Sequence, residues 1–396
     1  MSSKRQAAVL AFSIAMAVLS PPAEAASSDQ LENAPAFMAL CQILRQCQKS
    51  FDAPQDTEAT AAAAAFKGIL AAEHLASTND TYVSEKIAAE VDGLQKALKP
   101  LPQNEAGLKA RHLNNETVEK ARAAKKTVDD AAQAIATDTA AANALLIEAI
   151  TGDGKLSDPA DDGAGYFTAT NAAKMFGSEA NNNQNCGETG TGDGSNSRNV
   201  GITLVSDLFC LCVRGSTWNK KVCHKSATTE ATGSSNYDNS ASHNANAYAA
   251  FIQKCSKRLK PVTPASLGAA VAAYNSQIGA LAWNISSNHD DAGYIVGYAH
   301  AGNTGCTGPD SQVCVNYKSL LEKSDATAIP WQVKIGQAID KLPSNAVVQE
   351  IKAGTQTLAH MNLTVWQIYY SALSQTATQV DHSPKLLDSK KFEENK

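Results

Sequence analysis

Residues 105–150 carry the pattern that decides the fold, and they read EAGLKARHLNNETVEKARAAKKTVDDAAQAIATDTAAANALLIEAI. The stretch contains no proline, and small or apolar side chains return along it every three or four residues. That spacing is the heptad-like repeat of a helix that packs against other helices. The repeat has one polar member, Thr139, and its other members are Ala121, Ala124, Val128, Ala131, Ile135, Ala142 and Leu146. The sequence therefore predicts one long helix from Glu105 to Ile150.

A second long helix is predicted over residues 57–98. Apolar residues recur there at intervals of three and four, namely Val83, Ile87, Val91, Leu94 and Leu98. The sequence Lys99-Pro-Leu-Pro ends this helix, because proline lacks a backbone donor and restricts the residue before it. Two long helices joined by a short turn are expected to run antiparallel. The predicted fold class is mainly α: a long antiparallel helical hairpin, similar to a coiled coil, with inserted disulfide-stapled, loop-rich lobes.

Shorter helices are expected before and after the hairpin. Residues 35–48 have amphipathic spacing, and so do residues 264–283 and 343–378. We expect the last two helices to pack along the hairpin. The predicted helical bundle therefore consists of residues 34–150, 264–283 and 343–378.

Two loop-rich lobes separate these helices in the sequence. Gly, Asn, Ser, Thr and Asp dominate residues 156–260, and residues 284–330 also lack a helical repeat. Within the first lobe we expect one strand, Gly201–Arg214, and one short helix, Ala247–Leu259. Five of the nine cysteines lie in this lobe. We therefore expect disulfides, rather than a core of its own, to hold it together.

The first 25 residues have the three parts of a secretory signal peptide. Lys4 and Arg5 provide positive charge, residues 7–19 form an almost continuous apolar run, and Ala23-Glu-Ala offers a cleavage site. The apolar run is shorter than the ~20 residues that a membrane-spanning helix needs. We therefore predict that residues 1–25 are removed on export and that the mature chain begins near Ala26.

All nine cysteines follow the signal peptide, in a compartment that favours disulfides: Cys41, Cys47, Cys186, Cys210, Cys212, Cys223, Cys255, Cys306 and Cys314. Because nine is odd, one thiol stays reduced, bonds a second chain or has its partner outside this sequence. Cys41 and Cys47 are about two helical turns apart, too far to bond each other, so each is expected to link its helix to another element. Cys210 and Cys212 are expected to take different partners, and Cys212–Cys223 is a candidate pair.

Four Asn-x-Ser/Thr sequences fit the same compartment, because enzymes of the secretory pathway glycosylate this motif in exposed backbone. Each is a candidate N-glycosylation site, and we expect one or two to be occupied. The four asparagines are Asn79, Asn115, Asn284 and Asn362.

The composition and the motifs argue against nucleic-acid binding and catalysis. The net charge is -5 and no stretch is strongly basic, whereas phosphate binding needs clustered Lys and Arg. The Cys210-x-Cys212 and Cys223-His224 pairs are spaced too tightly for a usual zinc site. Residues 158–163 resemble part of a calcium loop but lack the closing glutamate. Because hydrolase and metalloprotease motifs are absent as well, we expect no catalytic residue, no metal and no cofactor.

Several of these features occur together in one known family. They are an alanine-rich signal peptide, a helix with Leu40-Cys41, the long hairpin, the segment Asp207-Leu-Phe-Cys-Leu-Cys and the loop from Cys306 to Cys314. In this combination the sequence resembles the N-terminal domain of trypanosome variant surface glycoproteins. The cysteine-rich middle lobe is more similar to the class B branch than to class A. The resemblance covers nearly the whole mature chain and implies that residues 26–380 form one such domain.

The resemblance implies a surface coat glycoprotein and not an enzyme. Members of the family form homodimers around the helical bundle, stand on a glycosylphosphatidylinositol (GPI) anchor and pack densely against neighbouring coat proteins. The implied function is to shield the plasma membrane and, through antigenic variation, to evade host antibodies. Some class B members carry an O-linked sugar on an exposed serine, for which Ser311 is the candidate here.

The same scaffold implies an alternative function and a missing segment. It also serves as a receptor or serum-resistance protein that binds a host serum protein, and a receptor is expected to have a fixed site between its lobes. The family normally continues into a cysteine-rich C-terminal domain and a hydrophobic anchor signal, and neither precedes Lys396. We therefore expect residues 381–396 to begin a linker to an absent domain, in a fragment or a truncated relative. Only the GPI anchor of the full-length protein would bind the membrane.

Overall fold

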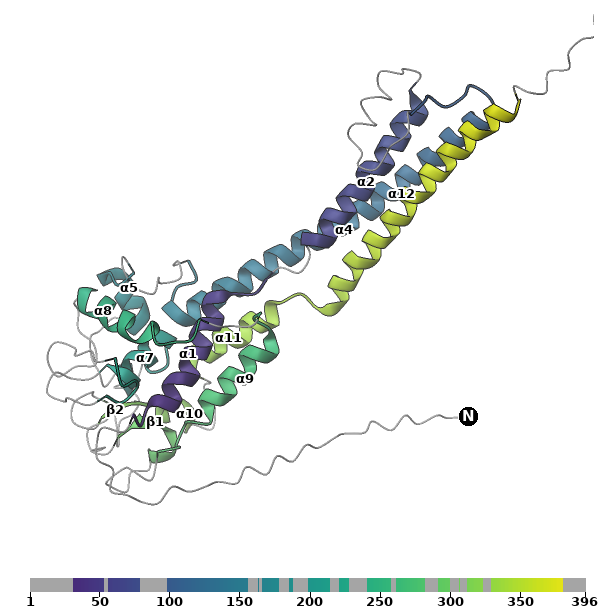
Figure 1. Ribbon diagram of the computed structural model, residues 1–396. Coiled ribbons are helices and arrows are strands. Elements are labelled where there is room, and N and C mark those ends of the chain that lie inside the picture. Colours follow the sequence, from purple (N-terminus) through teal and green to yellow (C-terminus); the bar gives the residue numbers. More distant parts are fainter. Residues whose placement is uncertain are drawn as a thin grey trace, which may run out of the picture.

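The molecule is elongated, with a bundle of long helices at one end and a compact group of shorter elements at the other (Figure 1). The stem is formed by α2 (Asp56–Ser77), α12 (Asn345–Gln379) and the first part of α4 (Glu105–Thr151). All other helices and strands, with the last turns of α4, form the head. The computed structural model describes residues 31–52, 56–78, 98–155, 163, 166–177, 185–187, 199–213, 221–227, 241–257, 261–281, 291–299, 306, 312–322 and 329–379.

Helix α4 runs through both parts as one element of 47 residues, which confirms the long helix predicted from Glu105. At about 1.5 Å per residue it is roughly 70 Å long. Its first turn is capped by Asn104, whose side chain accepts a hydrogen bond from the Gly107 amide at 3.0 Å. It ends where Gly152 adopts a left-handed conformation, φ 78°, which glycine tolerates without strain.

The stem is a three-helix bundle in which α2 and α4 run antiparallel and α12 packs along both (Figure 1). Buried side chains of α4 return every seven residues, as the sequence predicts for a coiled-coil-like helix. They are Gly107, Asn114, Ala121, Val128, Ile135, Ala142 and Ala149. The antiparallel hairpin and the later helix beside it are thus confirmed, but α2 ends at Ser77 and not at the predicted residue 98. The predicted seam at 83–94 lies outside the described residues, as do residues 1–25 and 381–396.

Polar contacts close the stem at the end that lies away from the head. Arg111 donates to the Ala76 carbonyl oxygen at 2.7 Å and to the Leu101 carbonyl oxygen at 3.0 Å. The Tyr369 hydroxyl donates to the Lys99 carbonyl oxygen and accepts from the Lys99 amide. These contacts hold the proline-containing turn against α2 and α12, so the polar backbone groups of the turn are paired.

The head is built from short helices and one small sheet. Strands β1 (Ile295–Tyr298) and β2 (Val313–Asn316) pair antiparallel, with Val296 opposite Val315. The helices of the head are α1 (Ala34–Lys49), α5 (Ala169–Phe176), α7 (Leu204–Cys212), α8 (Ala241–Ile252), α9 (Pro264–Asn275), α10 (Lys318–Leu321) and α11 (Pro330–Lys341), with the 3-10 turn η3 (Ala292–Tyr294).

The strand predicted at Gly201–Arg214 is wrong, because this segment forms α7. The Thr203 hydroxyl caps the helix by accepting from the Ser206 amide at 3.0 Å. Every residue of α7 is buried, so its apolar run shows neither the period of a helix nor that of a strand. Sequence periodicity cannot distinguish the two when no face meets solvent.

Several other boundaries differ from the prediction. Helix α8 lies earlier than the segment predicted at 247–259, and α11 was not predicted at all. Helix α9 ends at Asn275 and packs against α1 in the head, so the prediction that it packs along the hairpin is wrong. The two strands lie within 284–330, which was expected to be loop. These elements are short, and their packing decides where they begin and end.

The expectation that the middle lobe lacks a core of its own is also wrong. A single hydrophobic cluster in the head takes buried side chains from α1, α5, α7, α8, α9, α11 and both strands. Phe37 of α1, Phe209 of α7, Tyr248 of α8 and Trp331 of α11 are all fully buried within it. Disulfides therefore reinforce a packed core and do not replace one.

Candidate functional site

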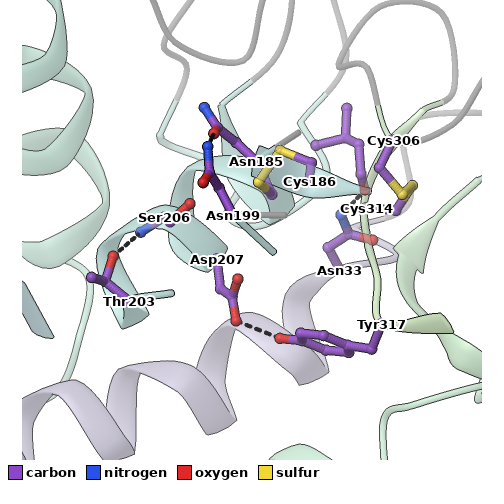
Figure 2. The surroundings of a disulfide bond; sticks show 12 residues. Asn33, Asn185, Cys186, Asn199, Thr203, Ser206, Asp207, Cys306, Cys314 and Tyr317 are labelled. Carbon is purple, nitrogen blue, oxygen red and sulfur yellow. Dashed lines mark hydrogen bonds between the residues drawn. A yellow bond between two sulfur atoms is a disulfide. The ribbon is translucent and has the colours of Figure 1, made fainter. Parts of the chain in front are cut away.

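Four disulfides are the most prominent feature of the head. They join Cys41 to Cys255, Cys186 to Cys210, Cys212 to Cys223, and Cys306 to Cys314. Cys210 and Cys212 of α7 take different partners, as their spacing predicts. The two bonds therefore link α7 to one segment that precedes it in the sequence and to one that follows it. The Cys306–Cys314 bridge ties the segment before β2 to the strand itself (Figure 2).

Helix α1 has one bridging cysteine and not the predicted two. The Cys41–Cys255 bond links α1 to the end of α8 and closes a loop with a sequence separation of 214. Cys47 takes part in none of the four bridges, and its side chain is fully buried. The prediction that Cys47 staples α1 to another element is therefore wrong, because its side chain belongs to the core of the head.

Buried asparagines connect segments that are far apart in the sequence. Asn33 donates from Nδ2 to the carbonyl oxygens of Leu211 and Val313, both at 2.7 Å. Asn199 donates to Oδ1 of Asn185 at 3.0 Å (Figure 2). Breaking a hydrogen bond of a buried amide is costly because no water replaces the lost partner, so these contacts fix the segments relative to one another.

A buried acidic residue lies at the centre of the head. Oδ2 of Asp207 accepts a hydrogen bond from the Tyr317 hydroxyl (Figure 2). The same oxygen accepts a second hydrogen bond from Trp331 Nε1, at 2.7 Å. The Tyr317 hydroxyl also lies 2.8 Å from the hydroxyl of Tyr274. Burial raises the pKa of Asp207 from 3.8 to about 7, although the hydrogen bonds from Tyr317 and Trp331 act in the opposite direction.

The remaining side chains of this cluster are neutral. Burial raises the pKa of Tyr274 and of Tyr317 well above 10, and the charge of Asp207 acts in the same direction. Sequence analysis found Asp207 only as part of a family pattern. A charged residue inside the apolar run of α7 is a signal of a buried acid, but nothing in the sequence identifies Tyr274, Tyr317 or Trp331 as its neighbours.

A hollow of about 370 Å³ lies between α1 and α9. Met38 and Gln42 line it from α1, and Ala273 and Ser276 line it from α9 and its end. None of its lining side chains is acidic or basic. The hollow therefore offers neutral hydrogen-bonding groups and apolar surface but no group for acid–base chemistry.

The structure places the candidate glycosylation sites differently. Asn115 is exposed on α4. Asn362 is half-buried in the stem, where its Oδ1 accepts from Trp366 Nε1 at 3.1 Å. A Cβ atom at Gly68 would lie 2.4 Å from the same oxygen, so α2 covers this side chain. Three further candidates, Asn79, Asn284 and Ser311, lie outside the described residues.

The described ranges lack two other kinds of site. No group of three or more His, Cys, Asp or Glu side chains there could hold a metal ion. No described helix is both long and apolar enough to cross a membrane.

The fold and the head together define an elongated, mainly helical domain whose packed head is reinforced by disulfides. Residues 71–360 match the family model of the trypanosomal VSG domain, VSG_B, where VSG denotes variant surface glycoprotein. This match covers well over half of the chain, and the chain therefore belongs to the variant surface glycoprotein family, as an N-terminal domain of the class B branch. Members of this family are surface coat glycoproteins of trypanosomes.

A curated relative agrees with this assignment. The chain is similar to variant surface glycoprotein YnAT 1.3 of Trypanosoma congolense, with 32% identity over 153 residues. The aligned region covers 36% of this chain and 35% of that protein. The chain thus aligns with about a third of the length of the relative.

Proposed function

We propose that this domain is the outer part of a coat glycoprotein that shields the plasma membrane of a trypanosome and varies antigenically to evade host antibodies. The observation that carries the proposal is the continuous helix α4, which joins the head to the far end of the stem (Figure 1). A rod roughly 70 Å long has a small cross-section for its length, so many copies can stand side by side on a membrane.

The division into head and stem supports this function physically. The buried positions of α4 hold the three helices of the stem together. In the head, four disulfides and a continuous core support the segments between the helices. A rigid scaffold of this kind tolerates sequence change in the segments that it carries, which antigenic variation requires.

The partners proposed here are a second copy of the chain, neighbouring coat proteins and host antibodies. We expect a homodimer around the helical bundle and attachment to the membrane through the GPI anchor of the full-length protein. An N-linked sugar on Asn115 would project from the exposed side of α4. Ser311 remains the candidate for an O-linked sugar.

Antibody access to intact cells tests the shielding function. One antibody is raised against the exposed face of α12 around Lys352, Gln356 and His360, and a second against the outer face of α9. Both should bind the purified chain, whereas only the α9 antibody should bind cells that carry the full-length protein at its natural density. Cells with a diluted coat are the control and should bind both.

Equal binding of the α12 antibody to dense and diluted coats would contradict shielding. Stoichiometric capture of one host serum protein by the purified chain would instead support the receptor or serum-resistance alternative. Sedimentation of the purified chain tests the homodimer, and a monomer at every concentration would contradict it.

A further inference from the structure

We propose that Asp207 acts as a proton-dependent latch in the head. With a neutral carboxyl group, the cluster of Asp207, Tyr317, Trp331 and Tyr274 holds its elements together. When the carboxyl group is ionised, the head unfolds more readily.

The geometry shows why these four side chains can act as one unit. Asp207 comes from α7, Tyr274 from α9, Tyr317 from the end of β2 and Trp331 from α11. All four are fully buried. The hydrogen bonds from Tyr317 and Trp331 converge on one oxygen of Asp207, and Tyr317 extends the chain to Tyr274. Elements up to 124 residues apart in the sequence therefore meet at a single carboxyl group.

No positive charge neutralises this carboxyl group. Among the described residues, no lysine, arginine or histidine forms an ion pair with Asp207. The titratable groups that face it are Tyr274 and Tyr317, which are neutral. Charged side chains on the elements around it are bound elsewhere: Arg45 to the Ile252 carbonyl oxygen, Lys174 to Asp153, Lys318 to Asp291, and Lys334 to Glu148.

A carboxylate in this position is costly because it has lost water and gained no counter-ion. The neutral donors Tyr317, Trp331 and the Gly201 backbone amide offset only part of that cost. The neutral acid avoids it and still offers an oxygen to Tyr317 and Trp331. The geometry therefore favours the protonated form in the folded head, in agreement with the pKa of about 7 that burial gives Asp207.

The dependence on pH follows from the difference between the folded and unfolded states. Between pH 3.8 and about 7 the folded chain keeps a proton that the unfolded chain has released. The free energy of unfolding therefore falls as pH rises through this window and levels off above it. For these two pKa values, the unfolding equilibrium constant is expected to rise about 30-fold between about pH 5.5 and 8.5 because of Asp207.

Urea unfolding of the whole chain with its disulfides intact tests the latch across this pH range. The wild type is compared with Asp207→Asn, whose amide keeps an oxygen acceptor but cannot ionise. The control is Asp340→Asn, which removes an exposed carboxylate from α11 in the same head. The ratio of the unfolding constants of wild type and Asp207→Asn should rise about 30-fold from the acidic to the alkaline end. The ratio for the control should stay constant.

A constant ratio for Asp207→Asn would overturn the proposal. Should that variant fail to fold, infrared difference spectra of the wild type provide the second measurement. A buried protonated carboxylic acid has a carbonyl stretch distinct from that of a carboxylate. This band should be present at about pH 5.5 and lost at about pH 8.5 while the helices remain folded. Its absence at the acidic end, where exposed acids are ionised, would overturn the latch.

Discussion

Replacing Gly354 by alanine should weaken the stem, although alanine favours helices. Gly354 lies on α12, where it faces Val128 of α4. A Cβ atom added at Gly354 would lie 2.5 Å from Cγ2 of Val128, whereas carbon atoms in contact stay about 3.5–4.0 Å apart. Val128 is buried, and a β-branched side chain in a helix has one strongly preferred rotamer. Either this valine must leave its rotamer or the two helices must separate.

The magnitude results from two opposing terms. Overpacking a buried contact costs about 1–3 kcal/mol. Exchanging glycine for alanine inside a helix returns about 1 kcal/mol. The difference is a net loss of up to about 2 kcal/mol, so we expect Gly354→Ala to lower the free energy of unfolding by an amount in this range. Urea unfolding of the purified chain, followed by far-ultraviolet circular dichroism, measures this change.

Gly336 of α11 is the matched control. It also lies in a helix that packs against α4, but a Cβ atom there would meet nothing within 4 Å. Gly336→Ala should therefore raise the free energy of unfolding by about 1 kcal/mol. A Gly354→Ala variant as stable as Gly336→Ala would contradict the prediction, because Gly354 is then not required for the close approach of α12 to α4.

The remaining predictions concern polar and covalent features. Asn114→Leu should raise the free energy of unfolding by about 1–3 kcal/mol. The reason is that Asn114 is fully buried and neither its Nδ2 nor its Oδ1 has a described hydrogen-bond partner. A variant less stable than the wild type in urea unfolding would contradict this prediction. Peptide mapping with and without an N-glycosidase should show a mass shift at Asn115 and none at Asn362, and the reverse pattern would refute the placement. Replacing Cys41 and Cys255 together by serine should cost about 2–5 kcal/mol in thermal or urea unfolding, and unchanged stability would exclude this bond as a stabilising link.

Local periodicity predicted the stem well because the same contact repeats along it. The small or apolar residues of α4 from Ala121 to Ile135 pack with residues of α2 and α12 in one cluster, so the packing follows directly from their regular spacing. The predicted pairing of Cys212 with Cys223 was likewise local, because only 11 positions separate the two residues. In both cases the residues that contact each other, or that share a helix face, are close in the sequence, so their spacing alone was enough to predict the structure.

Prediction failed where contacts are distant in the sequence or surround an element on every side. Helix α7 is buried all round, so its sequence has no exposed face to reveal a period. Nothing local distinguishes Cys41, which bonds Cys255, from Cys47, which is packed into the core. Asn362 belongs to a glycosylation motif, yet its side chain lies against α2 and Trp366.

The sequence by itself determined that this protein has a long helical stem, because a repeat of three and four residues is a property of one helix. It also determined which family the chain resembles. Only the tertiary structure decided that the head has a continuous core, which cysteine stays outside the bridges, and that Asp207 meets Tyr317 and Trp331. The physical reason is that burial is a collective property. Whether a side chain is removed from water, and what it then contacts, depends on segments that can be hundreds of residues away.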